Sequence, residues 1–102
     1  MKPDKIQAFI GLAMKAGKVA AGEFCTEKAV KSGIAFLVIT AEDASENTKK
    51  KFSDMCKYYR VPFLTYSDKD SLGYIIGKQQ RAMLAITDNG FASKLKTMIE
   101  NK

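Results

Sequence analysis

The sequence contains no histidine and no tryptophan, and it has only two cysteines and two prolines. Without histidine, the chain cannot form the Ser-His or Cys-His pairs that activate a nucleophile, and it lacks a side chain found in most zinc sites. Its glycines follow neither the G-x-G-x-x-G nor the P-loop spacing, and no G-x-S-x-G segment occurs. We therefore expect a protein that is not an enzyme and that holds no metal and no cofactor.

Long apolar runs and closely spaced cysteines are also missing. The longest uninterrupted apolar run, residues 35–39, is far shorter than the roughly 20 residues that a transmembrane helix needs. The N-terminus lacks the apolar stretch and the small-residue cleavage site of a signal peptide. Cys25 and Cys56 stand 31 positions apart and form no C-x-x-C unit. These absences predict a cytoplasmic protein with reduced thiols and no membrane partner.

Basic side chains outnumber acidic ones by 17 to 11, which gives a net charge of +6 and favours polyanionic partners. The alternative is a soluble, lysine-rich surface without a specific partner. Residues 1–41 and 75–102 each carry an excess of three positive charges, whereas residues 42–74 are neutral. If folding brings the first and last thirds together, one face of the molecule becomes electropositive, as in nucleic-acid-binding proteins.

Apolar side chains at helical spacing predict five helices. The first covers residues 6–14, the second covers residues 24–32, and the third follows Ser45. The inner faces of the last three helices are formed by Thr48, Phe52, Met55, Cys56 and Tyr59, then by Leu72, Ile75 and Ile76, and finally by Phe91, Leu95, Met98 and Ile99.

Four apolar segments between these helices predict strands at residues 19–21, 35–40, 61–66 and 82–87. The segment at residues 35–40 does not alternate between apolar and polar side chains, which is typical of a central strand covered on both faces. Because proline donates no backbone hydrogen bond, Pro62 must stand at the start of the third strand, or that strand must lie at a sheet edge. Strands that alternate with helices, without a linker or a repeat, predict an α/β layered fold that forms one domain across residues 1–102.

Residues suited to helix ends support these boundaries. The starts are marked by Pro3, by Ser45, by Ser67 with Asp70 in an S-x-x-D pattern, and by Asp88, and the first helix ends at Gly17. Two groups of neighbouring acids, at positions 42–43 and 68–70, stand at predicted helix starts. Acids at these places complement the helix dipole, so we interpret them as structural rather than catalytic.

Two loops are candidates for binding. The first consists of Gly22, Glu23, Phe24, Cys25 and Thr26 and opens a helix whose first turns carry Thr26, Lys28 and Lys31. Free amides, a hydroxyl and lysines at a helix N-terminus form a natural phosphate site. The alternative is an ordinary glycine turn before a surface helix.

The second loop consists of Lys78, Gln79, Gln80 and Arg81 and precedes the last strand. Glutamine and arginine can hydrogen-bond base edges as well as phosphates. The alternative is a solvated turn between a helix and a strand. Each loop by itself is weak evidence for binding.

The spaced combination of motifs resembles a known family. The residues that carry the resemblance are Ala16-Gly17-Lys18, Gly22-x-x-x-Thr26-x-Lys28-Ala29-Val30-x-x-Gly33, residues 36–43, Val61-Pro62-Phe63, Leu72-Gly73-x-x-x-Gly77-Lys78-x-x-Arg81 and Leu84-Ala85-Ile86-x-Asp88. Together they are similar to the kink-turn RNA-binding ribosomal proteins of the L-seven-Ae and L-thirty-e group. The short chain resembles the small bacterial, YlxQ-like branch of that group.

The resemblance implies a three-layer α/β/α sandwich around a four-stranded mixed sheet. It also implies a partner, a sharply bent RNA internal loop with sheared G·A pairs in ribosomal RNA or another structured RNA, and a protein that is ribosomal or ribosome-associated and monomeric when free. The implied binding segments match residues 22–28 and 78–83, and the middle third would lie mostly away from the RNA. The candidate RNA-binding residues are Lys18, Gly22, Glu23, Phe24, Cys25, Thr26, Lys28, Lys31, Lys78, Gln79, Gln80, Arg81, Ala82 and Met83.

This chain departs from the group's pattern at two places. Phe24 and Cys25 stand where many members carry Asn-Glu, and the second loop is polar where high-affinity members are apolar. These departures predict weaker base-specific readout with intact backbone and phosphate contacts. The alternative function is a protein-interaction module on the same fold that no longer binds RNA. The RNA-binding interpretation requires both loops to lie side by side, and therefore requires the first and last strands to run antiparallel.

Overall fold

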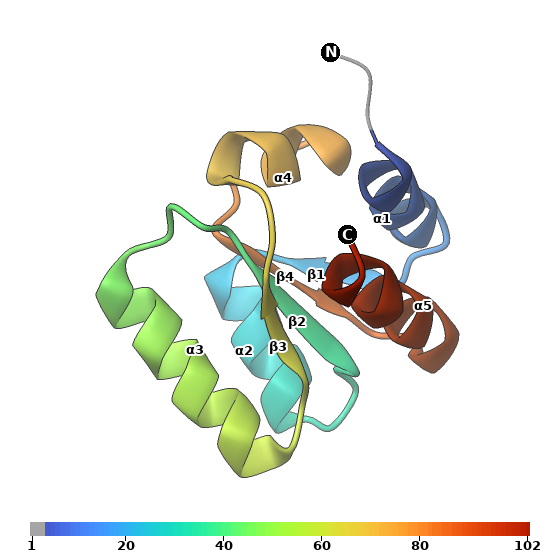
Figure 1. The fold of residues 1–102 in the computed structure, drawn as a ribbon. Helices are drawn as coiled ribbons and strands as arrows, with labels where there is room; N and C mark the ends of the chain where they lie inside the picture. The colour runs from blue at the N-terminus through green and yellow to red at the C-terminus, as the bar shows by residue number, and fades with distance from the viewer. Residues whose placement is uncertain (1–3) are drawn as a thin grey trace.

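The computed structural model of the protein describes residues 4–102, which fold into five helices and four strands (Figure 1). In chain order these are α1 (Lys5–Lys15), β1 (Val19–Ala21), α2 (Glu23–Lys31), β2 (Leu37–Thr40), α3 (Glu46–Tyr59), β3 (Phe63–Thr65), α4 (Lys69–Ile75), β4 (Met83–Ile86) and α5 (Asn89–Glu100). Pro3, expected in the first helical turn, lies outside the described residues. Among residues 4–102, no helix combines the length and the apolar character needed to cross a membrane.

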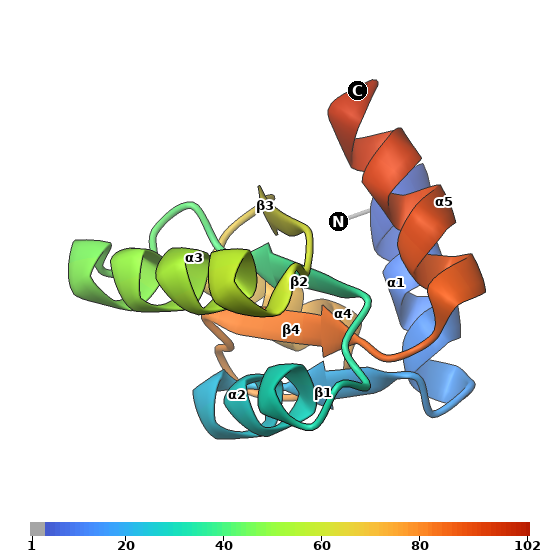
Figure 2. The same cartoon turned by 90° about the horizontal axis from the view of Figure 1, so that it is seen from below.

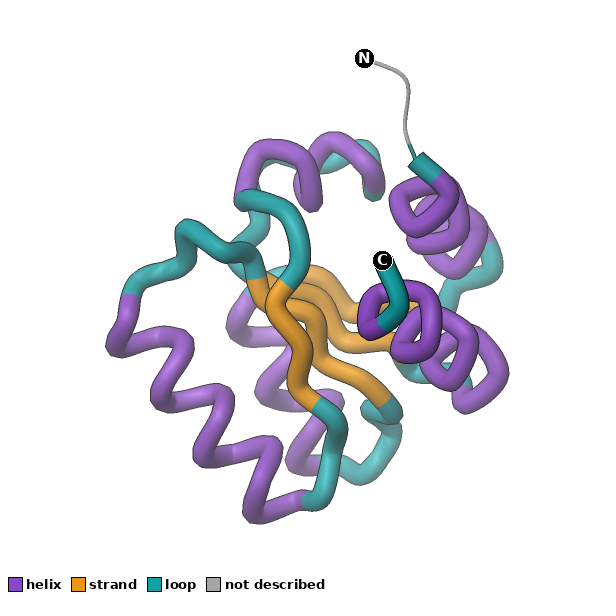
Figure 3. The backbone as a smooth tube through the Cα atoms, viewed as in Figure 1, coloured by secondary structure: helices purple, strands orange, loops and turns teal. Residues whose placement is uncertain are grey.

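The strands form one mixed sheet in the order β1-β4-β2-β3. β4 runs antiparallel to both of its neighbours, β1 and β2, whereas β2 and β3 are parallel. The predicted antiparallel pairing of the first and last strands is therefore confirmed, and β3 with its preceding Pro62 lies at an edge as expected. Because of this pairing, β1, β2 and β3 end where β4 begins. We call this end, at which β1, β2 and β3 finish and β4 starts, the loop end of the sheet. Figure 3 shows the connections at this end and at the opposite end.

Helices cover both faces of the sheet, which confirms the three-layer arrangement. One face packs against α1, α4 and α5 and the other against α2 and α3. Figure 2, the view from below, shows α2 and α3 apart from α1 and α5. The central strands supply alternate side chains to the two cores: Leu37, Ile39, Leu84 and Ile86 to the first, and Val38 and Ala85 to the second. All residues of β2 and β4 are buried, as a strand covered on both faces requires.

Most helix starts are capped as the sequence indicates. Ser45 and Asp88 accept hydrogen bonds from the third backbone amide beyond them and cap α3 and α5. Asp4 caps α1, and the hydroxyl of Tyr66 donates to its carboxylate at 3.1 Å. Burial, together with this hydrogen bond to an anion, raises the pKa of Tyr66.

The start of α4 differs from the prediction. Asp68, rather than Ser67, is the N-cap, and it accepts from the N–H of Ser71 at 2.7 Å. Ser67 has a φ of +63°, in the left-handed region, and so cannot take the extended conformation of an N-cap. Asp43 accepts from the N–H of Lys69 at 2.9 Å, so this acid supports α4 and not the helix that follows it in sequence.

The inner face of α3 is wrongly predicted at one position. Phe52 and Cys56 are buried, but Tyr59 is 40% exposed. Its ring packs edge-on against Tyr58, with centroids 4.9 Å apart, at the last turn of the helix. Burial raises the pKa of the Cys56 thiol to about 11, which makes it an unreactive core residue.

Candidate nucleic-acid interface

The two predicted loops lie side by side at the loop end of the sheet. The backbone N–H of Gly22 donates to the carbonyl oxygen of Met83 at 2.9 Å. The aliphatic part of the Arg81 side chain lies next to Gly22: a methyl group added to this glycine would be 3.6 Å from Arg81 Cδ. The expected juxtaposition of the two loops is therefore confirmed. We call the surface formed by residues 22–28 and 78–83 the loop-pair face.

The first loop leaves a helix N-terminus open. Gly22 is the N-cap residue of α2, with φ +89° and ψ 169°, and no side chain among residues 4–102 caps this helix. The first amides of α2 are left for an external acceptor, which favours an anion. Three side chains of this loop are exposed: the acidic Glu23, the aromatic Phe24, which is 80% exposed, and the thiol of Cys25.

The second loop is held against α4 by its own backbone. The N–H of Lys78 donates to the carbonyl of Gly73 at 2.8 Å, and the N–H of Arg81 donates to the carbonyl of Lys69 at 3.1 Å. The approach is so close that a methyl group on Gly73 would lie 2.1 Å from the carbonyl oxygen of Gln79. The loop is thus a fixed turn, which places its side chains before any ligand binds.

The side chains of Arg81 and Gln80 already form hydrogen bonds within the protein. One terminal amino group of Arg81 donates to the carbonyls of Gln79 and Gln80, at 3.2 and 2.8 Å. The side-chain amide of Gln80 donates to Asp70 at 2.6 Å. Since a guanidinium has five N–H donors, Arg81 keeps donors for a ligand while its position is fixed.

Two lysines supply positive charge to the loop-pair face. Lys28, in the second turn of α2, and Lys78 are both exposed. Within residues 4–102, neither forms an ion pair with a protein carboxylate. Both ammonium groups are therefore available to an external anion.

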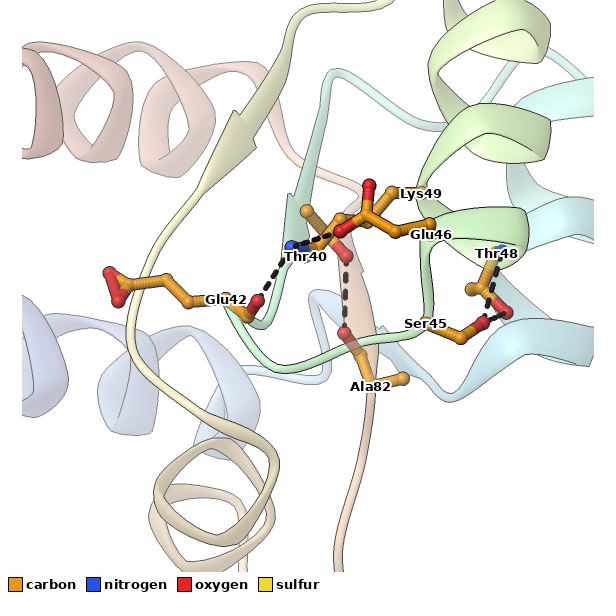
Figure 4. Close-up of polar contacts among 7 residues, drawn as sticks. All are labelled: Thr40, Glu42, Ser45, Glu46, Thr48, Lys49 and Ala82. Atoms are coloured by element: carbon orange, nitrogen blue, oxygen red, sulfur yellow. Dashed lines mark hydrogen bonds and ion pairs between the residues drawn. The ribbon is translucent and has the colours of Figure 1, made fainter.

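A segment that sequence reasoning missed completes this end of the sheet. The connection between β2 and α3 touches the second loop, since the N–H of Ala41 and the hydroxyl of Thr40 both donate to the carbonyl of Ala82, at 2.7 and 3.4 Å. In Figure 4, Lys49 donates to the carbonyl of Glu42 at 2.6 Å and steadies this connection. The middle third of the chain thus borders the loop-pair face. Only the strand order could have revealed it, because β2 ends beside the start of β4.

Four predicted residues do not present side chains on this face. Thr26 and Met83 are fully buried, and the Thr26 hydroxyl donates to the carbonyl of Ala20 at 3.5 Å. Lys18 precedes β1 and so lies at the opposite end of the sheet, where its carbonyl accepts from Thr87 N–H.

Lys31 is the fourth, because it is the last residue of α2 rather than part of its first turns. Its ammonium group lies 2.7 Å from the carboxylate of Glu27, which also pairs with Lys51 at 3.0 Å. The hydrogen bond that Lys31 donates to Glu27 raises the pKa of Lys31, and the hydrogen bonds that Glu27 accepts from Lys31 and Lys51 lower the pKa of Glu27. Lys31 is thus committed to an ion pair away from the loop-pair face.

The cysteines and the other side chains that could bind a metal ion are not gathered into a site in the described part of the chain. Cys25 is exposed and Cys56 is buried, and both are free thiols. Across residues 4–102, no three histidine, cysteine, aspartate or glutamate side chains gather into a group that could hold a metal ion.

Comparisons with known proteins agree with this architecture. Two curated relatives are named RNA-binding protein YlxQ. The one from Bacillus subtilis is 44% identical over 91 residues, which cover 89% of this chain and 91% of the relative. The one from Enterococcus faecium is 45% identical over 96 residues, which cover 94% of this chain and 92% of the relative.

Two solved structures share the fold. A Bacillus halodurans protein described as having unknown function superposes with a TM-score of 0.92 at 37% identity, covering 96% of this chain and 99% of that one. A 15.5kD RNA binding protein of Giardia lamblia superposes with a TM-score of 0.79, covering 99% of this chain and 92% of that one. Its 18% identity makes it evidence for the fold alone. A family model matches residues 4–96. The chain therefore belongs to the ribosomal protein L7Ae/L30e/S12e/Gadd45 family.

Proposed function

We propose that this protein binds structured RNA through the loop-pair face and catalyses no reaction. The observation that carries the proposal is the juxtaposition of residues 22–28 and 78–83, which combines an open helix N-terminus with exposed Lys28 and Lys78. The names of the two curated relatives, both RNA-binding proteins, support it. The proposal takes residues 1–102 as one domain that is cytoplasmic and monomeric when free.

The proposed target is a kink-turn-like bent internal loop, in ribosomal RNA or another structured RNA, with the ribosome as a further partner. Regular RNA duplexes hide their base edges in a deep, narrow groove, so a compact protein gains specificity from unstacked positions. The loop-pair face suits such a target, because a fixed polar turn lies beside a phosphate-binding helix start. Lys28, Lys78 and the first amides of α2 would hold phosphates.

Base contacts would come from the second loop and from Phe24. The Gln79 side chain forms no hydrogen bond within residues 4–102, and Arg81 retains guanidinium donors. Both can donate to base edges, and the exposed ring of Phe24 can stack on a splayed base. Gln80 would contribute less, because its amide is already bound to Asp70.

A titration with two matched RNAs tests this function. A kink-turn RNA should bind more tightly than the same RNA with its G·A pairs changed to Watson–Crick pairs. We expect a difference of about 1–3 kcal/mol, the scale of base-specific contacts in DNA recognition, because the duplexed control hides its base edges. Fluorescence anisotropy at physiological salt measures it. Equal affinity for both RNAs would favour the protein-interaction alternative.

Replacing Lys28 by alanine separates phosphate binding from specificity. Affinity should fall for every RNA tested, and the slope of log affinity against log salt should flatten by about 0.7–0.9 for each phosphate that the variant no longer neutralises. Lys31→Ala is the matched control, since Lys31 lies on the same helix but pairs with Glu27. An unchanged slope in Lys28→Ala, or equal slopes in both variants, would contradict the phosphate site at the start of α2.

A further inference from the structure

A hollow of about 260 Å³ lies at the end of the sheet opposite to the loop-pair face. Its lining residues lie just before β2, just before β3 and in the first part of α5, elements that Figure 1 locates in the fold. Phe36, Pro62 and Ala92 give it an apolar lining, and Ser93 adds a hydroxyl. The volume is below the roughly 300–1,000 Å³ of small-molecule sites, so the hollow suits one inserted side chain better than a cofactor.

Exposed apolar side chains collect around this end. Seven large hydrophobic side chains are exposed among residues 4–102, and four of them belong to the segments that lead into β2 and β3. These four are Ile34, Phe36, Tyr58 and Tyr59, which are 53%, 43%, 80% and 40% exposed. Phe36 lines the hollow, and Ile34 and Tyr59 are the sequence neighbours of its lining residues Ala35 and Arg60. Exposed apolar residues gathered at one end of a molecule are typical of a protein-binding surface.

The charge at the rim of the hollow is positive. Arg60 and Lys96 line it, and none of its lining residues is acidic. Arg60 is exposed, and its side chain forms no ion pair or hydrogen bond within residues 4–102. Lys96 lies 3.2 Å from the carboxylate of Glu100, so Arg60 is the cation available to a partner.

We infer that this end of the sheet docks an acidic segment of a protein partner. One aromatic or aliphatic side chain of that segment would fill the hollow, and a neighbouring carboxylate would pair with Arg60. An RNA occupant is less suited, because phosphates gain nothing from Ile34, Phe36 and Pro62. The three- and four-residue strands separate this surface from the loop-pair face by about 10–13 Å. The protein can therefore hold RNA at one end and an acidic partner at the other.

Nuclear magnetic resonance on the full, ¹⁵N-labelled chain tests the inference with three synthetic peptides of about a dozen residues. The first is rich in aspartate and glutamate around one phenylalanine, the second replaces that phenylalanine by serine, and the third replaces the acids by lysine. Only the first should shift the backbone amides of Phe36, Arg60 and Ser93, without shifting those of residues 22–28. Failure of this peptide to shift them, or equal binding of the serine peptide, would overturn the inference.

Arg60→Glu supplies the charge-reversal control. The Arg60 backbone is left-handed, with φ +60°, which glutamate adopts about as readily as arginine, so the fold should be retained. The variant should bind the acidic peptide about fivefold more weakly, gain affinity for the lysine peptide and keep its RNA affinity. Lys28→Ala should do the reverse, weakening RNA binding and keeping the peptide. Shifts of the Phe36 amide on adding kink-turn RNA, or on raising the protein concentration alone, would assign this surface to RNA or to a second copy instead.

Discussion

Gly73→Ala is expected to destabilise the protein by ~3 kcal/mol, the upper end of the usual overpacking range, and to lower its RNA affinity tenfold or more. The added methyl group would lie 2.1 Å from the carbonyl oxygen of Gln79 and 2.6 Å from its carbonyl carbon. Both are backbone atoms, so the second loop must move as a unit. Alanine also gains up to about 1 kcal/mol in helix propensity over glycine, but the clash outweighs this gain. Thermal unfolding and RNA titration measure the two effects.

Gly11→Ala is the matched control for this clash. Gly11 lies inside α1, and a methyl group there would meet its nearest neighbour, the carbonyl oxygen of Ile75, at 3.9 Å, an ordinary van der Waals distance. This variant should be as stable as the parent or gain up to about 1 kcal/mol, with unchanged RNA affinity. If Gly73→Ala behaved like Gly11→Ala, the fixed position of the second loop would not be needed for binding.

Gly22→Ala is expected to destabilise the protein by about 1–3 kcal/mol, through backbone strain rather than crowding. The methyl group would find Arg81 Cδ at 3.6 Å, which leaves room for it. The conformation of Gly22, φ +89° and ψ 169°, lies in a region that is essentially restricted to glycine. Relaxing it would pull the Gly22 amide from Met83 and turn the first loop away from Arg81. The melting temperature should fall by about 4–8 °C per kcal/mol for a domain of this size, and RNA affinity should fall with it.

A D-alanine at position 22 distinguishes strain from the removal of a flexible glycine. D-residues favour positive φ, so this substitution should keep stability and RNA affinity close to those of the parent. Cys25 allows the variant to be made by ligating a synthetic thioester of residues 1–24 to a fragment that begins at Cys25. Equal destabilisation by L- and D-alanine would show that the backbone conformation of Gly22 is not the cause.

Much of the fold was predictable because its signals are local. The apolar spacing of Ile6, Ile10 and Ala13 predicts α1, and these three residues are its buried positions. The apolar run at residues 35–39, which covers most of β2, predicts a strand covered on both faces, and the two cores confirm it. Such signals lie within a few residues of one another, so a helix period or a cap can be recognised without knowing what packs against it.

The candidate site was predictable only as two segments, because side-chain roles depend on neighbours distant in sequence. Thr26 and Lys28 stand two positions apart on one helix, yet the packing of α2 buries the first and exposes the second. The sequence predicts Lys31 as a phosphate ligand, whereas in the structure its ammonium group forms an ion pair with Glu27. The S-x-x-D pattern predicts Ser67 as the N-cap of α4, but the left-handed backbone of Ser67 leaves this role to Asp68. Asp43, 26 positions before Lys69, also accepts from the Lys69 amide at the start of α4.

Sequence patterns alone predict the helices and strands, their alternation, the excess of positive charge in the first and last thirds, and the glycines that mark both loops. These features follow from side-chain chemistry at short range. The strand order, and with it which connections meet at each end of the sheet, depends on how the whole chain packs. That order sets Gly22 against Met83 and brings the connection after β2 to the loop-pair face. Strand pairing is a long-range choice made by the packing of both cores together, and no local pattern encodes it.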